Sequence, residues 1–270
     1  MSFLDVPGAR LYYESQGEGP LLLLIGSPMD STGFAPLAQV MAERYTVVTY
    51  DPRGIGKSTR EDADADITPE VQADDVHRLI ESLGGGPVDY LGSSGGAVVG
   101  LALITAHPGD VRTLVAHEPP IVETLPDSAE VHAKFEEIYQ TFLAQGSMPA
   151  LTMFLTYAGL AGMGQQDDVP RWEPSPEQLA TMEATNTVFF GHLIRQTNAF
   201  VPDLDALRTS PVRIVVGVGA ASKGQFARRC AEVFAGQVGL TPVEFTGDHG
   251  GFAAHAPEFA EQLTAVLQET

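Results

Sequence analysis

The sequence predicts an α/β fold in which helices cover both faces of a mostly parallel sheet and a helical insertion forms a cap. Short aliphatic runs of strand length alternate with segments of helical spacing along most of the chain. That order is typical of parallel strands joined by helical crossovers. The runs are apolar throughout and do not alternate with polar residues, so we expect strands that are buried on both faces.

The elements of the core follow in order along the chain. Arg10-Leu-Tyr-Tyr-Glu alternates in polarity and predicts a half-buried antiparallel strand, followed by a turn at 17–20. Apolar runs predict six further strands over 21–25, 46–50, 88–91, 111–116, 212–218 and 242–245. Helical spacing predicts helices over 36–44, 68–83, 95–106, 222–238 and 258–267.

One long stretch, 121–201, contains no convincing strand. It carries helical segments over 128–144, 148–160 and 175–198, separated by turns that contain Gly and Pro. Because this stretch falls between the fourth and fifth parallel strands, we expect it to lie over the carboxyl edge of the sheet. The predicted division is a core of residues 1–120 and 202–270 with a cap of residues 121–201, in one domain.

The composition is that of a globular but strongly acidic protein. Of 270 residues, 44% are hydrophobic and 19% are charged, which is unlike a disordered chain. The 35 Asp and Glu against 15 Lys and Arg give a formal charge of −20. Such a surface repels phosphate, so we expect neither nucleic acid nor an anionic membrane as a partner. The longest strongly apolar run, 21–25, is far shorter than the roughly 20 residues that span a bilayer.

Two features bear on the compartment. The single cysteine, Cys230, cannot form an internal disulfide and lies in a segment of helical spacing, so we expect a packed thiol. The N-terminus lacks a basic region followed by an apolar stretch, so no secretory signal is predicted. We therefore expect a cytoplasmic protein, and the sequence leaves a homodimer open.

The strongest local motif is Gly92-Ser93-Ser94-Gly95-Gly96, which lies between a predicted strand and a predicted helix. In that context a Gly-x-Ser-x-Gly pentapeptide predicts a sharp turn that exposes its central serine at the edge of the sheet. Positions two before and two after the serine must be nearly free of side chain, and Gly92 and Gly96 meet this need. Ser94 is therefore the predicted nucleophile, and Ser93 is expected to point elsewhere.

With this segment in place, the chain resembles the α/β-hydrolase superfamily. Three further stretches are similar to that family's motifs and come in its order: Leu21-Leu-Leu-Leu-Ile-Gly-Ser-Pro, Asp51-Pro-Arg-Gly-Ile-Gly-Lys-Ser and Gly247-Asp-His-Gly-Gly-Phe. The resemblance covers the whole core and implies the α/β-hydrolase fold, with no cofactor and no metal. We interpret Asp51 as structural, anchoring Arg53 and nearby backbone.

A general base is required, because a serine hydroxyl is a weak nucleophile until a neighbour takes its proton. His249 follows the last predicted strand in a glycine-rich loop and is the predicted base. His77 and His107 lie in or at the end of predicted helices, where packing or surface roles are expected. His117 comes too early for the order of serine, acid and histidine that the family has.

The acid departs from the family pattern. The resemblance implies an Asp after the strand at 212–218, yet the sequence there, Gly217-Val-Gly-Ala-Ala-Ser-Lys-Gly, has no carboxylate. A base without an acid loses its preferred tautomer, so a substitute is expected. Glu118, at the carboxyl end of 111–116, is the predicted acid, and Asp203 and Asp205 remain alternatives.

The resemblance also implies an oxyanion hole, formed by the backbone N–H groups of Gly95 and Ser27. The family commonly has His-Gly where this chain has Ile25-Gly26. The backbone donor survives that change, and the hydroxyl of Ser27 is open as an additional polar contact.

The cap is rich in large apolar side chains, some of which we expect to line a pocket. Those assigned to substrate binding, together with one residue of the core, are Met29, Phe154, Tyr157, Phe189 and Phe190, and Met163 belongs to the same apolar set. An apolar pocket under an acidic surface favours a small, neutral, hydrophobic substrate over a polyanion.

The serine at the turn decides between reaction classes. Epoxide hydrolases and haloalkane dehalogenases of this fold need an aspartate there, so acyl chemistry is favoured. The leading expectation is hydrolysis of a carboxylic ester or lactone through an acyl-enzyme. Two alternatives remain: a non-hydrolytic lyase, cyclase or cofactor-free haloperoxidase-like enzyme, raised by the missing late Asp, and a ligand-binding protein on the same fold.

Overall fold

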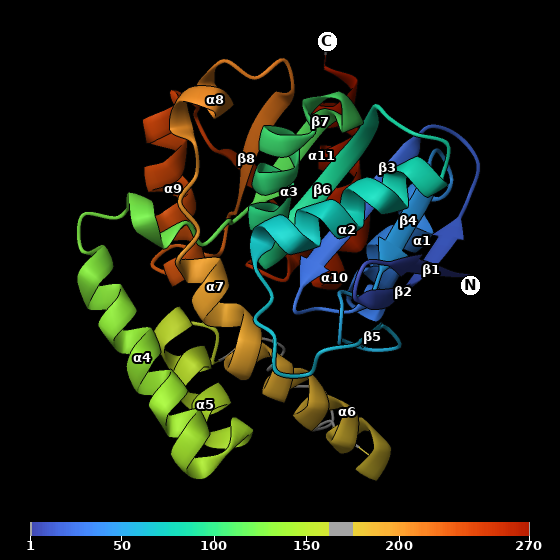
Figure 1. Cartoon of the computed structure of the whole chain (residues 1–270). Helices are drawn as coiled ribbons and strands as arrows, with labels where there is room; N and C mark the ends of the chain where they lie inside the picture. The colour runs from blue at the N-terminus through green and yellow to red at the C-terminus, as the bar shows by residue number, and fades with distance from the viewer. Residues whose placement is uncertain (1, 162–174, 270) are drawn as a thin grey trace.

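A single nine-stranded sheet forms the centre of the computed structural model, which describes residues 2–161 and 175–269 (Figure 1). Its strands are β1 (Ser2–Val6), β2 (Ala9–Gln16), β3 (Leu21–Ser27), β4 (Thr46–Tyr50), β5 (Thr59–Arg60), β6 (Val88–Ser94), β7 (Val111–His117), β8 (Arg213–Gly219) and β9 (Val243–Phe245). The order is β1-β2-β4-β3-β6-β7-β8-β9, and β5 pairs with β2. Pairs from β4 to β9 are parallel, whereas β1, β2 and β5 pair antiparallel.

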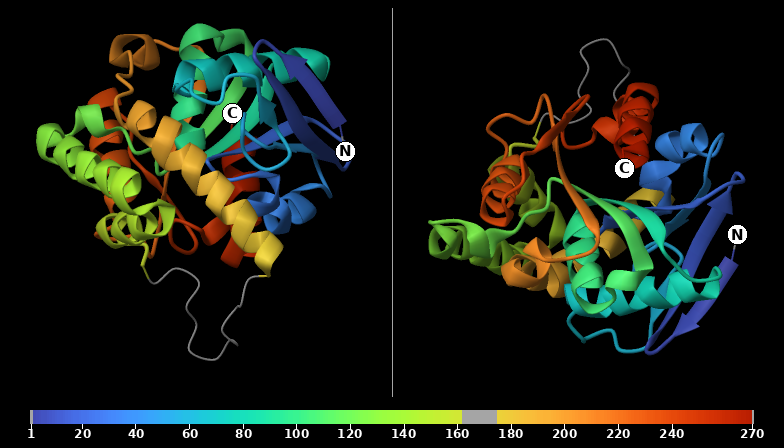
Figure 2. Two further views of the ribbon diagram at one scale, coloured as in Figure 1. Left: turned by 60° about the horizontal axis from the view of Figure 1, so that its bottom comes forward. Right: turned by 90° about the horizontal axis from the view of Figure 1, so that it is seen from above.

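Helices cover both faces of this sheet, as the sequence predicts. One face carries α2 (Pro69–Ser82), α3 (Gly95–Ala106), α8 (Leu204–Arg208) and α9 (Phe226–Val238). The other carries α1 (Ala35–Met41), α10 (Gly251–Ala254) and α11 (Ala256–Gln268). Seen from above, α2 and α3 lie on the opposite side of the sheet from α1 and α11 (Figure 2). The central strands are therefore buried on both sides, which accounts for their continuous apolar character.

The described part of the stretch between β7 and β8 is largely helical and forms a cap-like layer beside the sheet (Figures 1 and 2). It contains α4 (Ser128–Gln145), α5 (Ser147–Ala158), α6 (Pro176–Val188) and α7 (Ile194–Asn198), with a π-helical turn at Phe189–Leu193 between the last two. Short 3₁₀ turns lie at Ser31–Phe34, Pro108–Asp110 and Val122–Thr124. None of the helices within residues 2–161 and 175–269 combines the length and apolar character needed to cross a membrane.

The register of the parallel strands brings distant residues to one edge. Ser27 at the end of β3 pairs with Ser94 at the end of β6, and Ser93 pairs with His117 at the end of β7. His117 in turn pairs with Gly217 of β8. The carboxyl ends of these strands thus form one continuous edge, which is where open α/β sheets bind their ligands.

Candidate active site

Ser94 lies on a strained turn between β6 and α3. Its backbone angles are φ 55° and ψ −123°, a region that non-glycine residues rarely occupy. The turn is as tight as the motif implies: an added Cβ at Gly96 would lie 2.1 Å from the carbonyl oxygen of Ile25, and one at Gly92 would lie 2.5 Å from that of Gly96. The side chain of Ser94 is presented to a cavity at the edge of the sheet.

Glu118 is the second residue with unusual backbone, at φ 48° directly after β7. Its side chain is fully buried and both of its oxygens are used. Oε1 accepts from the backbone N–H of Gly219 at 2.8 Å, and Oε2 lies 2.5 Å from Nδ1 of His249. The two segments that meet here are more than a hundred residues apart, since Glu118 and Gly219 are separated by 101 positions.

Electrostatics keep this carboxylate ionised. Burial by itself raises the pKa of Glu118, but the hydrogen bond to His249, the neighbouring imidazoles of His117 and His249, and the N–H of Gly219 outweigh it and bring the pKa to about 2. A carboxylate that is ionised at neutral pH and bonded to Nδ1 fixes which nitrogen of His249 carries the proton. Nε2 is then the nitrogen left to act as a base.

His249 lies in the loop after β9, and its side chain is 13% exposed. It lines the same cavity as Ser94, so the structure brings the predicted base, acid and nucleophile to one place. The neighbouring Asp248 is used differently, because its Oδ1 accepts from the N–H of Gly250 at 2.9 Å. Of the carboxylates considered from the sequence, Glu118 is the one bonded to the imidazole.

The two alternative acids lie elsewhere. Asp203 caps the N-terminus of α8, where its Oδ1 accepts from the N–H of Ala206 at 2.9 Å. Asp205 is 94% exposed and pairs with Arg208 at 2.6 Å. Both side chains form contacts within or next to α8 and neither bonds to His249, so neither completes a triad in this structure.

Arg228 supports the position of Glu118 through Gly219, and the sequence did not predict this contact. Arg228, on α9, is 7% exposed and donates from Nη1 to the carbonyl oxygen of Gly219 at 2.7 Å. It also pairs with Glu232 at 2.8 Å and Glu244 at 2.9 Å, which balance its charge. Gly219 thus holds Glu118 through its N–H and is itself held through its carbonyl. Nothing in the sequence around Arg228 distinguishes it from an ordinary helix residue.

His117 lies next to this network but does not reach the cavity. It is fully buried and packs edge-on against Phe245, Phe252 and Phe259, with its ring centroid 6.3 Å from that of His249. Neither ring nitrogen has a hydrogen-bond partner among the described residues. Burial lowers the pKa of His117 to about 4, so the ring is neutral at physiological pH. Its surroundings are those of a core residue.

The cavity in front of Ser94 has a volume of about 290 Å³ and a mostly apolar lining. Of the predicted substrate-binding residues, Met29, Phe154 and Phe189 line it. Tyr157 and Phe190 do not line it, so their part in substrate binding stays a prediction. Tyr157 packs on Phe135 and Phe226, with ring centroids 5.6 and 5.4 Å away.

Phe190 packs into the cap and does not reach the cavity. It is fully buried against Phe189, which does line the cavity, and against Phe142, with ring centroids 4.9 and 6.0 Å away. Met163 lies outside the described residues.

Asp51 is structural and anchors nearby backbone, as expected. It is 2% exposed and accepts from the backbone N–H groups of Ser31 and Lys57, both at 2.8 Å. It does not anchor Arg53, which instead forms two hydrogen bonds to Asp75, at 2.7 and 2.5 Å. Asp51 therefore ties the loop after β3 to the loop after β4.

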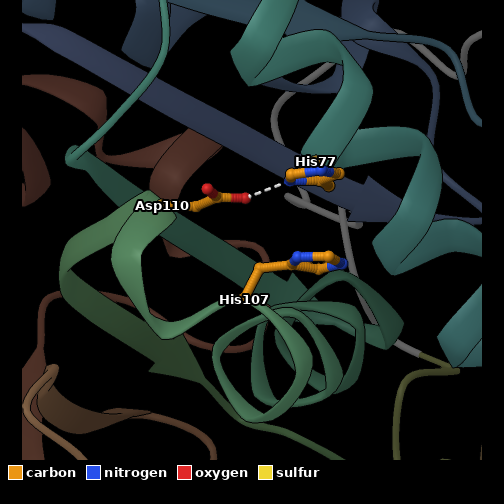
Figure 3. A group of neighbouring side chains, drawn as sticks. All are labelled: His77, His107 and Asp110. Atoms are coloured by element: carbon orange, nitrogen blue, oxygen red, sulfur yellow. Dashed lines mark hydrogen bonds and ion pairs between the residues drawn. The ribbon is translucent and has the colours of Figure 1, made fainter.

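Among the described residues, His77, His107 and Asp110 form one group whose side chains could approach a metal ion (Figure 3). The two imidazoles are stacked, with centroids 3.8 Å apart and planes 7° from parallel. Lone pairs of stacked rings run side by side and do not converge on a common point. Nδ1 of His77 is also already bonded to Asp110 at 2.6 Å. We interpret the group as a packed contact at the amino end of β7, remote from the sheet edge that carries Ser94.

Comparisons with known proteins agree with this architecture. The family model described as alpha/beta hydrolase fold matches residues 19–160. The uncharacterised hydrolase YraK of Bacillus subtilis is 31% identical over 275 residues, covering 98% of this chain and 95% of that protein. A thermophilic esterase from Thermogutta terrifontis has a TM-score of 0.79 at 17% identity, covering 99% of this chain and 98% of that one. The enol-lactonase from Burkholderia xenovorans has a TM-score of 0.72 at 19% identity, covering 99% of this chain and 100% of that one.

Proposed function

The chain belongs to the α/β-hydrolase fold family, and we propose that it hydrolyses carboxylic esters or lactones of small hydrophobic molecules through an acyl-enzyme on Ser94. The observation that carries this proposal is the 2.5 Å contact between Nδ1 of His249 and the buried carboxylate of Glu118, at a cavity that Ser94 also lines. A nucleophile, a base and an orienting acid are the parts that serine acyl transfer requires.

The proposed reaction proceeds in two halves. Oγ of Ser94 attacks the carbonyl carbon while Nε2 of His249 takes its proton, and the resulting oxyanion accepts from the N–H groups of Gly95 and Ser27. The bond to the leaving oxygen then breaks as Nε2 returns the proton to it. Water attacks the acyl-enzyme with the same base, which releases the acid and restores Ser94. Glu118 stabilises the imidazolium in each half.

The character of the site supports esters over other hydrolase substrates. A serine at the turn forms an acyl-enzyme, whereas opening an epoxide in this fold calls for a carboxylate nucleophile. The lining is dominated by aromatic and aliphatic side chains such as Phe154, Phe189 and Met29, which suits an uncharged hydrophobic acyl or alcohol group. The names of two structural neighbours, an esterase and an enol-lactonase, describe reactions of this class.

The main argument for a non-hydrolytic enzyme no longer applies. It was favoured by the missing Asp after β8, and Glu118 offers a carboxylate bonded to His249 from the neighbouring strand. No observation favours the receptor alternative, which the experiment below separates from catalysis.

The test is turnover of p-nitrophenyl butyrate together with covalent labelling by an organophosphate, read by intact-protein mass spectrometry. We expect the wild type to form product and one adduct, and Ser94→Ala to lose both, with turnover falling by at least about 10³-fold. Ser93→Ala is the matched control, since Ser93 is the adjacent serine of the same strand, and it should keep the adduct. Turnover that survives Ser94→Ala would refute the assignment, and ligand binding without turnover in the wild type would favour the receptor.

A further inference from the structure

The hydroxyl of Ser27 lies beside the proposed nucleophile. Ser27 ends β3, pairs in register with Ser94 and lines the cavity, although only 4% of its surface is exposed. An added Cβ at Gly95, the residue after the nucleophile, would lie 3.1 Å from the Cβ of Ser27. The Ser27 side chain is thus adjacent to the residue that supplies the first proposed oxyanion donor.

The partner of this hydroxyl is Gln72, a polar residue in an apolar position. Gln72 is 1% exposed and lies one turn of α2 before Val76, which belongs to the hydrophobic core. An aliphatic side chain would be buried there without the cost of desolvating an amide, so the amide calls for an explanation. Oγ of Ser27 donates to Oε1 of Gln72 at 2.9 Å, whereas Nε2 of Gln72 finds no hydrogen-bond partner among the described residues.

The unpartnered nitrogen indicates a second arrangement of the same two side chains. A half turn of the carboxamide exchanges Oε1 and Nε2, so that Nε2 donates to Oγ of Ser27. The buried donor of Gln72 then has an acceptor and the O–H of Ser27 is released, while Oε1 moves to the position in which Nε2 had no partner. The released O–H faces a cavity in which the carbonyl oxygen of an ester bound at Ser94 becomes negatively charged.

We propose that the Ser27 hydroxyl donates a third hydrogen bond to the oxyanion, and that Gln72 is the positioning residue that directs it. This inference rests on the proposed acyl transfer. No covalent bond changes at either side chain: the O–H leaves Oε1 of Gln72 and bonds the substrate oxygen as its charge develops. Because that charge is absent from the bound ester and develops as the bond to Ser94 forms, the contact acts on kcat more than on KM.

The experiment is a double-mutant cycle of Ser27→Ala, Gln72→Met and the double variant, assayed with p-nitrophenyl butyrate. Ser27→Ala keeps the backbone N–H, and we expect kcat to fall about 10- to 100-fold with KM changed less than about threefold. Gln72→Met leaves the hydroxyl unrestrained, and we expect kcat to fall about 2- to 10-fold, the cost of ordering one rotor. The double variant should match Ser27→Ala, because Gln72 acts only through Ser27.

Stability separates this role from a structural one. Gln72→Met replaces a buried amide by an apolar side chain of similar shape, so its melting temperature should equal or exceed that of the wild type while kcat falls. The matched control is Val76→Ala on the same helix, which should lower the melting temperature and leave kcat unchanged. A trifluoromethyl ketone, which mimics the oxyanion, should bind Ser27→Ala more weakly by about the same factor as kcat/KM falls.

Several outcomes would overturn the inference. Unchanged kcat in Ser27→Ala, in an enzyme that Ser94→Ala inactivates, overturns the third donor and leaves the proposed function standing. Additive losses in the double variant overturn the role of Gln72. A wild type with neither ester turnover nor organophosphate adduct overturns the proposed function and the inference together.

Discussion

Two side chains of the proposed triad lie on backbone that disfavours them. Ser94 and Glu118 are the non-glycine residues with positive φ within residues 2–161 and 175–269. Such conformations cost about 1–3 kcal/mol each and persist only where the surroundings enforce them. For Glu118 the enforcing contacts are its own N–H to the carbonyl of Gly217 at 2.9 Å and its carboxylate to Gly219 and His249. Strain at both residues, and not at ordinary surface turns, supports the proposal that they act together in catalysis.

The acid role of Glu118 leads to a prediction at this scale. Glu118→Gln keeps the shape and the acceptor for Gly219, but it places an amide opposite Nδ1 of His249. The imidazole must then carry its proton on Nε2, where it cannot act as a base, so we expect kcat to fall by about 10³- to 10⁴-fold. The measurement is ester turnover at pH 7.5, with Asp205→Asn as control. Near-normal turnover of Glu118→Gln, or a comparable loss in Asp205→Asn, would contradict the assignment.

At the scale of elements, the sequence predicted those that have a repeating pattern. The parallel strands and the helices α2, α3, α9 and α11 follow from apolar runs and helical spacing, within a few residues at their ends. The two-residue β5 is too short to show a period, and β1 is mostly exposed, so neither was predicted. The predicted helix 175–198 is interrupted by a π-helical turn at Phe189–Leu193. The sequence did not predict this turn, because a π-helical turn changes the direction of the side chains but leaves no mark in the residue composition.

That turn yields a prediction about two adjacent side chains. Phe190 is fully buried in the cap, so Phe190→Ala should destabilise the protein by about 3–5 kcal/mol. Phe189 lines the cavity, so Phe189→Ala should enlarge it and raise kcat/KM for p-nitrophenyl octanoate relative to the acetate. Urea unfolding and the ratio of the two esters check both effects, and each variant serves as the control for the other. A selectivity change in Phe190→Ala that equals or exceeds that of Phe189→Ala would contradict the placement.

At the scale of the whole molecule, the site depends on contacts that no local pattern records. The nucleophile turn and the histidine loop are each encoded within a few residues and were predicted. The partner of His249 comes from 131 positions away, so the sequence could only favour Glu118 over Asp203 and Asp205. Arg228 and Gln72 were not singled out, because their contacts with Gly219 and Ser27 become visible only once the strands are aligned. The alignment of the strands in the folded sheet, more than the composition of any one segment, therefore brings these side chains together.

The same packing makes the fold sensitive to acid. The pKa of His117 falls from 6.5 in the unfolded chain to about 4 in the fold, and that of Glu118 from 4.5 to about 2. Between pH 6.5 and 4 the unfolded state therefore binds a proton at His117 that the folded state does not. Over that window stability falls as pH falls, by about 3 kcal/mol for a 2.5-unit difference. Glu118 adds a loss of the same sign between pH 4.5 and 2.

We therefore expect His117→Leu to flatten the stability profile at mildly acidic pH. The neutral ring makes no hydrogen bond among the described residues, so an aliphatic side chain should cost little at pH 7.5 and remove the proton that opposes folding at pH 5.2. Urea unfolding at these two pH values measures the difference, and both lie above the sequence pI of about 4.5, where a net negative charge still keeps the chain soluble. His132→Gln is the control, because the side chain of His132 is partly exposed and pairs with Glu123 at 2.7 Å. If the loss of stability between pH 7.5 and 5.2 is equal in wild type and His117→Leu, groups other than His117 govern the acid response.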